Sequence, residues 1–134
     1  MLPVPSINSS TLASHPGGPA AAAVLHAALQ AVDPSISVQA YLRREGDRLE
    51  ISGQTCDLSG CLRVLLVAVG KAASPMARTA AEILGEFLTA GIVVTKDGHI
   101  HSADRADPRL SFYETGHPIP DERSVRAADR MLAC

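Results

Sequence analysis

The chain has 134 residues, of which 46% are hydrophobic and 19% are charged, and its formal net charge is −2. A chain of this length buries roughly 68% of its unfolded surface in one domain, so a second full domain is not expected. Without net positive charge there is no general attraction to nucleic acid or to anionic membranes. The longest unbroken apolar runs, Ala20–Leu25 and Val64–Val69, are far shorter than the ~20 residues of a membrane span. Neither nucleic acid nor a membrane is therefore expected as a partner.

The cysteines and the start of the chain indicate a reducing compartment. Cys56, Cys61 and Cys134 are an odd number of thiols, and the spacing of the first two is not that of a zinc site. No lysine or arginine precedes Arg43, so the basic residues of a signal or transit peptide are missing. These features predict free thiols and a cytoplasmic protein.

The first half of the chain predicts one long helix and little other regular structure. Residues 1–18 mix Pro, Ser and Gly without a period, which predicts a flexible leader before a domain over residues 19–134. Ala20 to Val32 has apolar residues at helical spacing, and Asp33 to Ser35 is expected to end this helix. The alternation of Leu49 and Ile51 with polar residues then suggests a small hairpin or an extended entry strand.

The middle of the chain predicts a strand, a helix and a second strand. Val64–Val69 is a continuous apolar run, typical of a parallel strand that is covered on both faces. Ser74 can cap the following helix, and Pro75 suits its first position. Gly91 to Thr95 then gives the second buried strand. Such a βαβ unit is nearly always right-handed.

A third strand and a last helix complete the predicted elements. Leu110 to Glu114 reads as the strand, and Asp121 as the N-cap of the helix. The helix has an expected apolar side of Val125, Ala128, Met131 and Leu132. Open α/β sheets usually have about five or six strands. The sequence therefore predicts an α/β fold with an incomplete open sheet and flanking helices, as the N-terminal portion of a larger protein.

The candidate site lies in the loops that follow the predicted strands, because ligands of open α/β sheets bind outside the carboxyl ends of the strands. Gly70 lets the backbone approach a ligand, and Lys71 stands beside a helix N-terminus. Free N–H groups and the helix dipole attract an anion there. A lysine at that end is electrostatically misplaced without an anion, which favours a binding role over a solvated surface charge.

Two nucleotide-binding fingerprints fail at this loop. A phosphate-binding G-x-x-x-x-G-K-[ST] loop would require glycine in place of Leu65 and a hydroxyl residue in place of Ala72. A dinucleotide G-x-G-x-x-G loop would require glycine at Ala72 and Pro75.

The stretch "GHPIPD" is the second candidate. Its two prolines, Pro118 and Pro120, fix two φ angles and hold His117 and Asp121 on a stiff turn. Asp121 is expected to be an N-cap, whereas His117 could donate to a phosphate or a carboxylate or merely tie the turn together. His99 and His101 form an H-x-H pair without further ligands nearby, so no metal site is expected.

Three stretches resemble, in order and spacing, the N-terminal part of the class II glycerate kinases, also called glycerate 2-kinases. They are "VAVGKAASPMARTAAEILG", "GIVVTKDGH" and "YETGHPIPDERSVRAADRML", and the resemblance covers about Ala20 to Leu132. It implies a Rossmann-like N-terminal domain that faces a second domain across the active-site cleft. It also implies phosphoryl transfer from ATP, with Mg²⁺, to the 2-hydroxyl of D-glycerate, giving 2-phosphoglycerate.

The resemblance assigns roles to both loops. Lys71 falls on the family's lysine, whose implied catalytic role is to hold substrate or the transferring phosphate, with Gly70 and His117 as further substrate-binding residues. Active-site lining residues are then Gly116, Pro118, Pro120 and Asp121. The family's glycine- and serine-rich phosphate-binding segment and its C-terminal domain have no counterpart in these residues. The chain is therefore expected to be inactive alone, because phosphoryl transfer depends on positioning and charge stabilisation.

Two alternatives remain open at this stage. An NAD(P)H-dependent hydroxypyruvate reductase would use Asp97, after the second strand, as a ribose-binding acid, and the family's older name supports this alternative. A non-catalytic assembly module would use the unpaired sheet edge and apolar helix faces to form a homo-oligomer.

Overall fold

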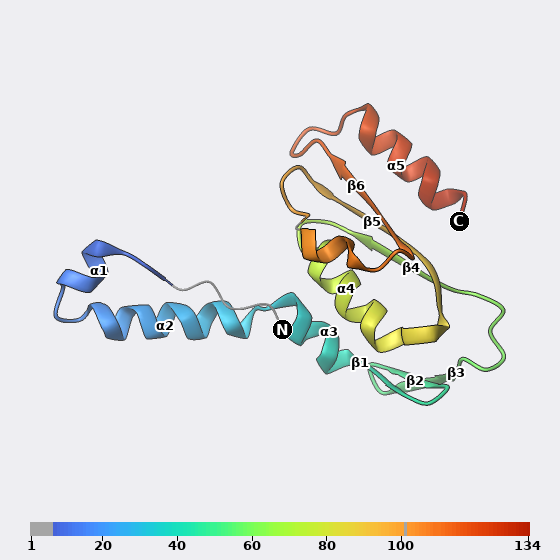
Figure 1. The fold of residues 1–134 in the computed structure, drawn as a ribbon, viewed down its shortest axis with the longest axis horizontal. Helices are drawn as coiled ribbons and strands as arrows, with labels where there is room; N and C mark the ends of the chain where they lie inside the picture. Colours follow the sequence, from blue (N-terminus) through green and yellow to red (C-terminus); the bar gives the residue numbers. More distant parts are fainter. Residues whose placement is uncertain (1–6, 101) are drawn as a thin grey trace.

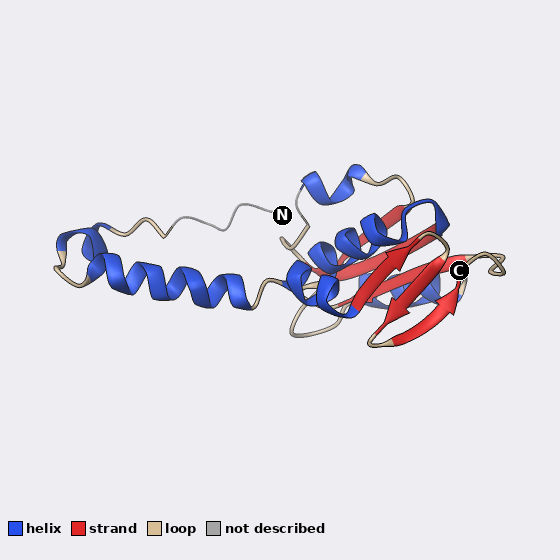
Figure 2. Ribbon diagram, turned by 90° about the horizontal axis from the view of Figure 1, so that it is seen from below, coloured by secondary structure: helices blue, strands red, loops and turns tan. Residues whose placement is uncertain are grey.

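The computed structural model describes residues 7–100 and 102–134. An α/β body contains two small sheets with flanking helices, and a helical arm extends from it (Figures 1 and 2). The α/β class expected from the sequence is confirmed.

The arm consists of α1 (Ser10–Ser14) and α2 (Gly18–Ala31), which pack mainly on each other. Helix α1 lies within the stretch that the sequence predicted to be a flexible leader. It is stabilised by an N-cap, since the Ser9 hydroxyl accepts from the Leu12 N–H at 3.3 Å. A Cβ on Gly18 would stand 1.5 Å from the Leu12 carbonyl oxygen, so glycine permits the tight α1–α2 turn. The sequence missed this turn; residues 1–6 of the expected leader lie outside the described residues.

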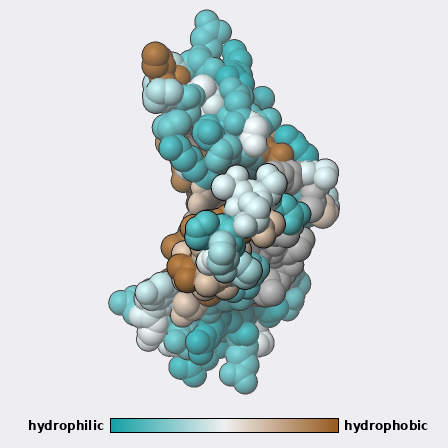
Figure 3. Space-filling view, turned by 90° about the vertical axis from the view of Figure 1, so that its left-hand side faces the viewer, coloured by the Kyte–Doolittle hydropathy of each residue, from teal (hydrophilic) through white to brown (hydrophobic). Residues whose placement is uncertain are grey.

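The apolar side chains of α2 are largely exposed. Val24 is 69% exposed and Leu29 47%. Figure 3, which views the molecule from the side of the arm, shows hydrophobic patches among hydrophilic ones. None of the described helices is by itself long and apolar enough to cross a membrane, although α2 together with α3 (Pro34–Tyr41), a bent pair, has the length and composition to do so.

Helix α3 begins where the sequence predicted only the end of a helix. The Asp33 carboxylate accepts from the Ser35 N–H at 2.8 Å, and Pro34 occupies the first turn. Asp-Pro is a strong helix start as well as a stop, since it ends one helix and caps the next. Helix α3 packs against α4 (Ala73–Leu84).

The first sheet is an antiparallel meander in the order β1-β2-β3. Its strands are β1 (Leu42–Glu45), β2 (Arg48–Ile51) and β3 (Gln54–Asp57). The sequence suggested a hairpin here and missed one strand. Arg44 joins this sheet to the body, because its Nε donates to the Ile83 carbonyl at 2.7 Å and its guanidinium pairs with Glu86 at 3.1 Å.

The second sheet is parallel, in the order β4-β5-β6, and positions the candidate site. Its strands are β4 (Val64–Val69), β5 (Leu88–Lys96) and β6 (Leu110–Thr115), connected through α4, η1 (Gly85–Phe87) and η2 (Ser102–Ala106) and followed by α5 (Glu122–Leu132). All three strands and both helices predicted for this region are present.

Helices α4 and α5 cover opposite faces of the parallel sheet (Figure 1). Val93 is fully buried in the core on the α4 side, whereas Ile92 and Val94 pack in the cluster that contains Ala127 of α5. Successive strand residues point to opposite faces, so β5 is buried on both.

The predicted apolar side of α5 is largely wrong. Ala127 is its buried residue, and Met131 packs beside it, but Val125 and Leu132 are 63% and 88% exposed, and Ala128 is also exposed. The helix contacts β6 at the margin of the sheet, so it buries only a narrow stripe of its surface.

Strand β4 is not covered on both faces, contrary to the prediction. Leu65, Val67 and Val69 are 41%, 49% and 64% exposed, while the intervening residues face α4. The reason is position: β4 is an edge strand, and α5 lies over the opposite edge of the sheet.

Candidate active site

Three loops leave the same edge of the parallel sheet. They follow β4 at Gly70, β5 at Asp97 and β6 at Gly116, and the strands run parallel in register. The carboxyl ends of parallel strands in an open α/β sheet are where ligands bind. The loops selected from the sequence are therefore at one edge.

The loop after β4 leads into a helix N-terminus without a side-chain cap. Gly70 has φ +120°, a conformation that favours glycine, and its N–H still donates to the Val94 carbonyl at 2.9 Å. Lys71 is exposed, and Ala72 is the N-cap of α4. In the first turn of α4 the Ala73 N–H donates to the Gly70 carbonyl at 3.1 Å, and Pro75 has no N–H. The positive end of the helix dipole, beside the Lys71 ammonium, still favours an anion here.

The predicted cap at Ser74 is wrong. The helix begins before Ser74, whose side chain is fully buried and whose Oγ has no hydrogen-bond partner. Serine is a frequent N-cap, but here packing against the core decides its position.

His99 holds the main chain of Lys71. Its Nδ1 lies 3.1 Å from the Lys71 carbonyl oxygen. A carbonyl only accepts, so Nδ1 carries the proton in this contact. The other member of the H-x-H pair, His101, lies outside the described residues. The sequence considered His99 only as a metal ligand and missed this contact.

The "GHPIPD" turn presents His117 at the surface. His117, Pro118 and Pro120 are exposed, and the His117–Pro118 peptide bond is cis. A Cβ on Gly116 would stand 2.8 Å from the Ile119 carbonyl oxygen and 2.9 Å from the Asp121 carboxylate. The turn therefore closes tightly around Gly116.

Asp121 is the N-cap of α5, as predicted. Its carboxylate accepts from the backbone N–H groups of Arg123 and Ser124, at 3.0 and 3.2 Å, and the Ser124 hydroxyl accepts in return from the Asp121 N–H. This reciprocal arrangement is a capping box. It fixes the direction in which α5 leaves the turn.

Lys71 and His117 do not lie on neighbouring strands. Lys71 follows β4 and His117 follows β6, and β5 runs between them. Adjacent strands are about 4.8 Å apart, so the two loops start roughly 10 Å from each other. A single ligand can contact both residues only if the two side chains, together with the ligand, reach across the end of β5.

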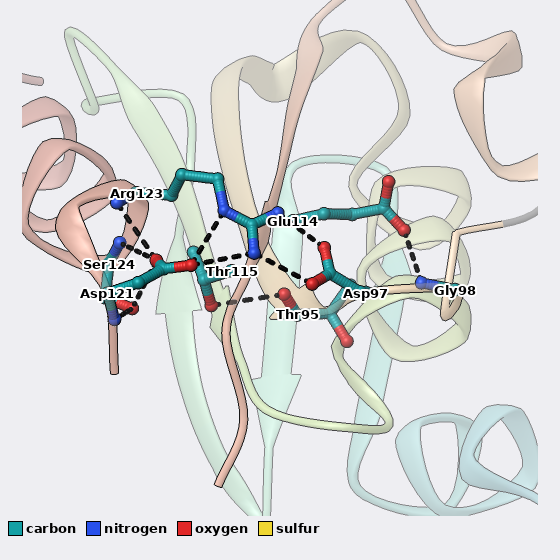
Figure 4. Close-up of polar contacts among 8 residues, drawn as sticks. All are labelled: Thr95, Asp97, Gly98, Glu114, Thr115, Asp121, Arg123 and Ser124. Atoms are coloured by element: carbon teal, nitrogen blue, oxygen red, sulfur yellow. Dashed lines mark hydrogen bonds and ion pairs between the residues drawn. The ribbon is translucent and has the colours of Figure 1, made fainter. Parts of the chain in front are cut away.

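Arg123 is the residue of this edge that the sequence did not indicate. Its guanidinium donates to Asp97 through Nη1 and Nη2, at 2.6 and 2.8 Å, and to Asp121 through Nε at 2.9 Å (Figure 4). These hydrogen bonds hold the pKa values of both carboxyl groups below their ordinary value and raise the pKa of Arg123. All three groups are therefore charged at neutral pH.

The described residues do not fit a metal ion. No group of three or more His, Cys, Asp or Glu side chains converges anywhere in residues 7–100 and 102–134. Two carboxylates at this edge of the sheet, Asp97 and Asp121, are both engaged by Arg123. The described residues thus offer a helix N-terminus beside a lysine but no cluster of three or more metal-ligating side chains.

Comparison with known proteins identifies the family. A domain family of unknown function, DUF4147, matches residues 20–134. The chain is 34% identical to a glycerate 2-kinase of Pyrococcus horikoshii over 106 residues, which are 79% of this chain and 22% of that protein. The chain belongs to the glycerate kinase family, in its N-terminal part.

Further relatives agree. A D-glycerate 2-kinase of Thermotoga maritima is 47% identical over 70 residues, 52% of this chain and 16% of that protein. A crystal structure of a P. horikoshii protein superposes with a TM-score of 0.66 at 34% identity, covering 77% of this chain and 22% of the other. The chain thus spans less than a quarter of the length of these relatives.

Proposed function

We propose that this chain forms the N-terminal part of a glycerate 2-kinase, which transfers a phosphoryl group from ATP to the 2-hydroxyl of D-glycerate and yields 2-phosphoglycerate. The family and the names of its relatives support the kinase. The observation that carries the proposal for these residues is the exposed Lys71 beside the uncapped N-terminus of α4, at the ligand-binding edge of a parallel sheet.

The two loops would act on the acceptor substrate. The Lys71 ammonium and the positive end of the α4 dipole attract an anion, either the glycerate carboxylate or the transferring phosphate. His117, across the end of β5, can donate to the other end of the same ligand. Gly70 keeps the backbone free of a side chain at this point, and Gly116, Pro118, Pro120 and Asp121 shape the turn.

The binding of ATP and Mg²⁺ would depend on the remaining length of the relatives. Gly70 and Lys71 match neither nucleotide fingerprint, and the described carboxylates provide no metal site. Because phosphoryl transfer relies on positioning and charge stabilisation from several groups, we expect the 134-residue chain alone to be inactive. No nucleic acid or membrane is needed for this function, and a cytoplasmic location suits it.

A chimera tests the proposal. Residues 20–134 replace the matched part of the P. horikoshii glycerate 2-kinase, and phosphorus NMR follows phosphorylation of D-glycerate by ATP. We expect 2-phosphoglycerate as the product. A folded chimera that forms no phosphoglycerate, or one that oxidises NADH with hydroxypyruvate instead, would contradict the proposal.

The reductase alternative has less support in the structure. Its ribose-binding acid would be Asp97, but both oxygens of this carboxylate accept from Arg123. A carboxylate bound in this way has less capacity to accept from a ribose hydroxyl.

A further inference from the structure

Arg123 joins two of the three loops at the candidate site. Asp97 is the first residue after β5, and Asp121 is the N-cap of α5 after the "GHPIPD" turn. Three nitrogens of one planar guanidinium bind these two carboxylates, with a second contact from Nη2 to Asp121 at 2.7 Å. Lysine could not reproduce this geometry, because its ammonium is a single point charge.

The position of Arg123 is unfavourable unless it has such partners. It lies in the first turn of α5, where the helix dipole disfavours a cation. Its two carboxylate partners offset that cost. An arginine at this position thus depends on the Asp97 loop being close to the start of α5.

The contacts continue from Asp97 to Lys71. The next residue, Gly98, donates its N–H to a Glu114 carboxylate oxygen at 2.8 Å (Figure 4). His99 follows and contacts the Lys71 carbonyl through Nδ1. The loop after β5 is therefore tied to the loop after β4 on one side and to Arg123 on the other.

The contacts also continue from Asp121 to the turn that carries His117. Gly116 packs directly against the Asp121 carboxylate, and a backbone hydrogen bond from Gly116 contributes to its lowered pKa. One series of contacts thus runs from Lys71 through the Asp97 loop and Arg123 to the residue before His117.

From this series we propose that Arg123 is a positioning residue, which sets the separation between Lys71 and His117 for a ligand that spans both. The proposal rests on the proposed function, because it assigns the two side chains to one ligand. The contacts are partly exposed, with Arg123 at 42% and Asp97 at 60%, and exposed ion pairs contribute little to stability. The loss of Arg123 should therefore change loop position more than stability.

The first test does not depend on kinase activity. In the 134-residue chain, Arg123→Gln should shift the amide NMR signals of Gly98, His99 and Lys71 while those of β5 stay in place. The matched control is Arg126→Gln, one turn further along α5, where the side chain pairs with Glu122 of the same helix at 3.6 Å. Unchanged signals at His99 and Lys71 in Arg123→Gln would overturn the proposal, and so would unfolding of the whole of α5.

The second test uses the chimera. Arg123→Gln should lower kcat/KM for D-glycerate by up to roughly 100-fold, since small displacements of binding groups have effects of that size. Arg126→Gln should leave it unchanged. Arg123→Lys keeps the charge and loses the forked geometry, so full activity in this variant would show an electrostatic role and overturn the positioning role.

The two tests separate the two proposals. An unaltered chimera without kinase activity would contradict the proposed function and leave the NMR result to decide whether Arg123 orders the loops. An active chimera in which Arg123→Gln has normal kcat/KM would contradict only the role of Arg123.

Discussion

At the scale of single residues, Lys71 carries the clearest functional expectation. We expect Lys71→Ala in the chimera to lower kcat for D-glycerate phosphorylation by roughly 100-fold, the usual cost of removing one charge-stabilising group. The side chain is exposed and follows β4 in a loop, so the melting temperature should stay close to that of the parent. Steady-state kinetics and thermal unfolding of the same preparation check both.

Lys71→Arg provides the matched comparison. A planar guanidinium occupies a different space beside the helix N-terminus than an ammonium does, so it should restore activity only in part. Near-normal turnover in Lys71→Ala would instead show a solvated surface charge.

Substitution of Gly116 should destabilise the fold for steric reasons. Gly116→Ala places a methyl group within 3 Å of the Ile119 carbonyl oxygen and the Asp121 carboxylate, so we expect a loss of about 1–3 kcal/mol in unfolding free energy. Urea unfolding measures it. The control is Gly60→Ala, where a Cβ would meet nothing within 4 Å and φ is not positive; an equal loss in both variants would contradict the steric argument.

The sequence predicted some of these residues and missed others for a physical reason. Lys71 and His117 could be placed at one edge from strand direction alone, since parallel strands share their carboxyl edge. Arg123 could not, because its role depends on a contact with Asp97, which is 26 residues away in the sequence. The contact of His99 with Lys71 could not be predicted from the sequence for the same reason.

At the scale of elements, the link between β5 and α5 should respond to acid. The Arg123 hydrogen bonds lower the pKa values of Asp97 and Asp121 below the ordinary value of 3.8. A lowered carboxyl pKa stabilises the folded state fully above the unfolded value and loses that contribution as the pH falls through the folded value. We therefore expect the stabilisation from this cluster to be constant near neutral pH and to disappear only below about pH 4.

Arg123→Gln isolates this contribution. In this variant the two carboxyl groups return toward ordinary pKa values, so the stability difference from the parent should be present at pH 6 and shrink toward pH 2. Urea unfolding across this range measures it, and Arg126→Gln serves as the control. A difference that grows on acidification would contradict the sign of the argument.

The elements themselves were predictable where the local pattern and the packing agree. Strand β5 is an apolar run and is buried on both faces. Helix α4 forms where its pattern predicts, and Ala80 and Leu84 are buried, whereas Met76 is 39% exposed. Ser74 shows the opposite case: its preference for an N-cap is local, but its buried position in α4 is decided by packing. The exposed face of β4 could not be predicted either, because an apolar run does not indicate whether a helix covers each face of the strand.

At the scale of the whole molecule, the arm and the body should be energetically separate in this chain. Helix α2 packs mainly on α1 and extends away from the sheets (Figure 1). Removing residues 1–31 leaves the Asp33 cap and α3 in place. Because this deletion removes few contacts with the body, we expect the unfolding free energy of the body to change by less than about 0.5 kcal/mol.

A longer deletion gives the contrast that makes this measurement decisive. Removing residues 1–41 also deletes α3, which packs on α4 and partly buries Val38. The loss of that apolar contact should cost more than about 1 kcal/mol. Urea unfolding of the two truncated chains, beside the parent, compares them directly. A substantial loss in the shorter deletion would mean that the exposed apolar residues of α2 pack on the body in solution, and the arm would then be part of the α/β domain.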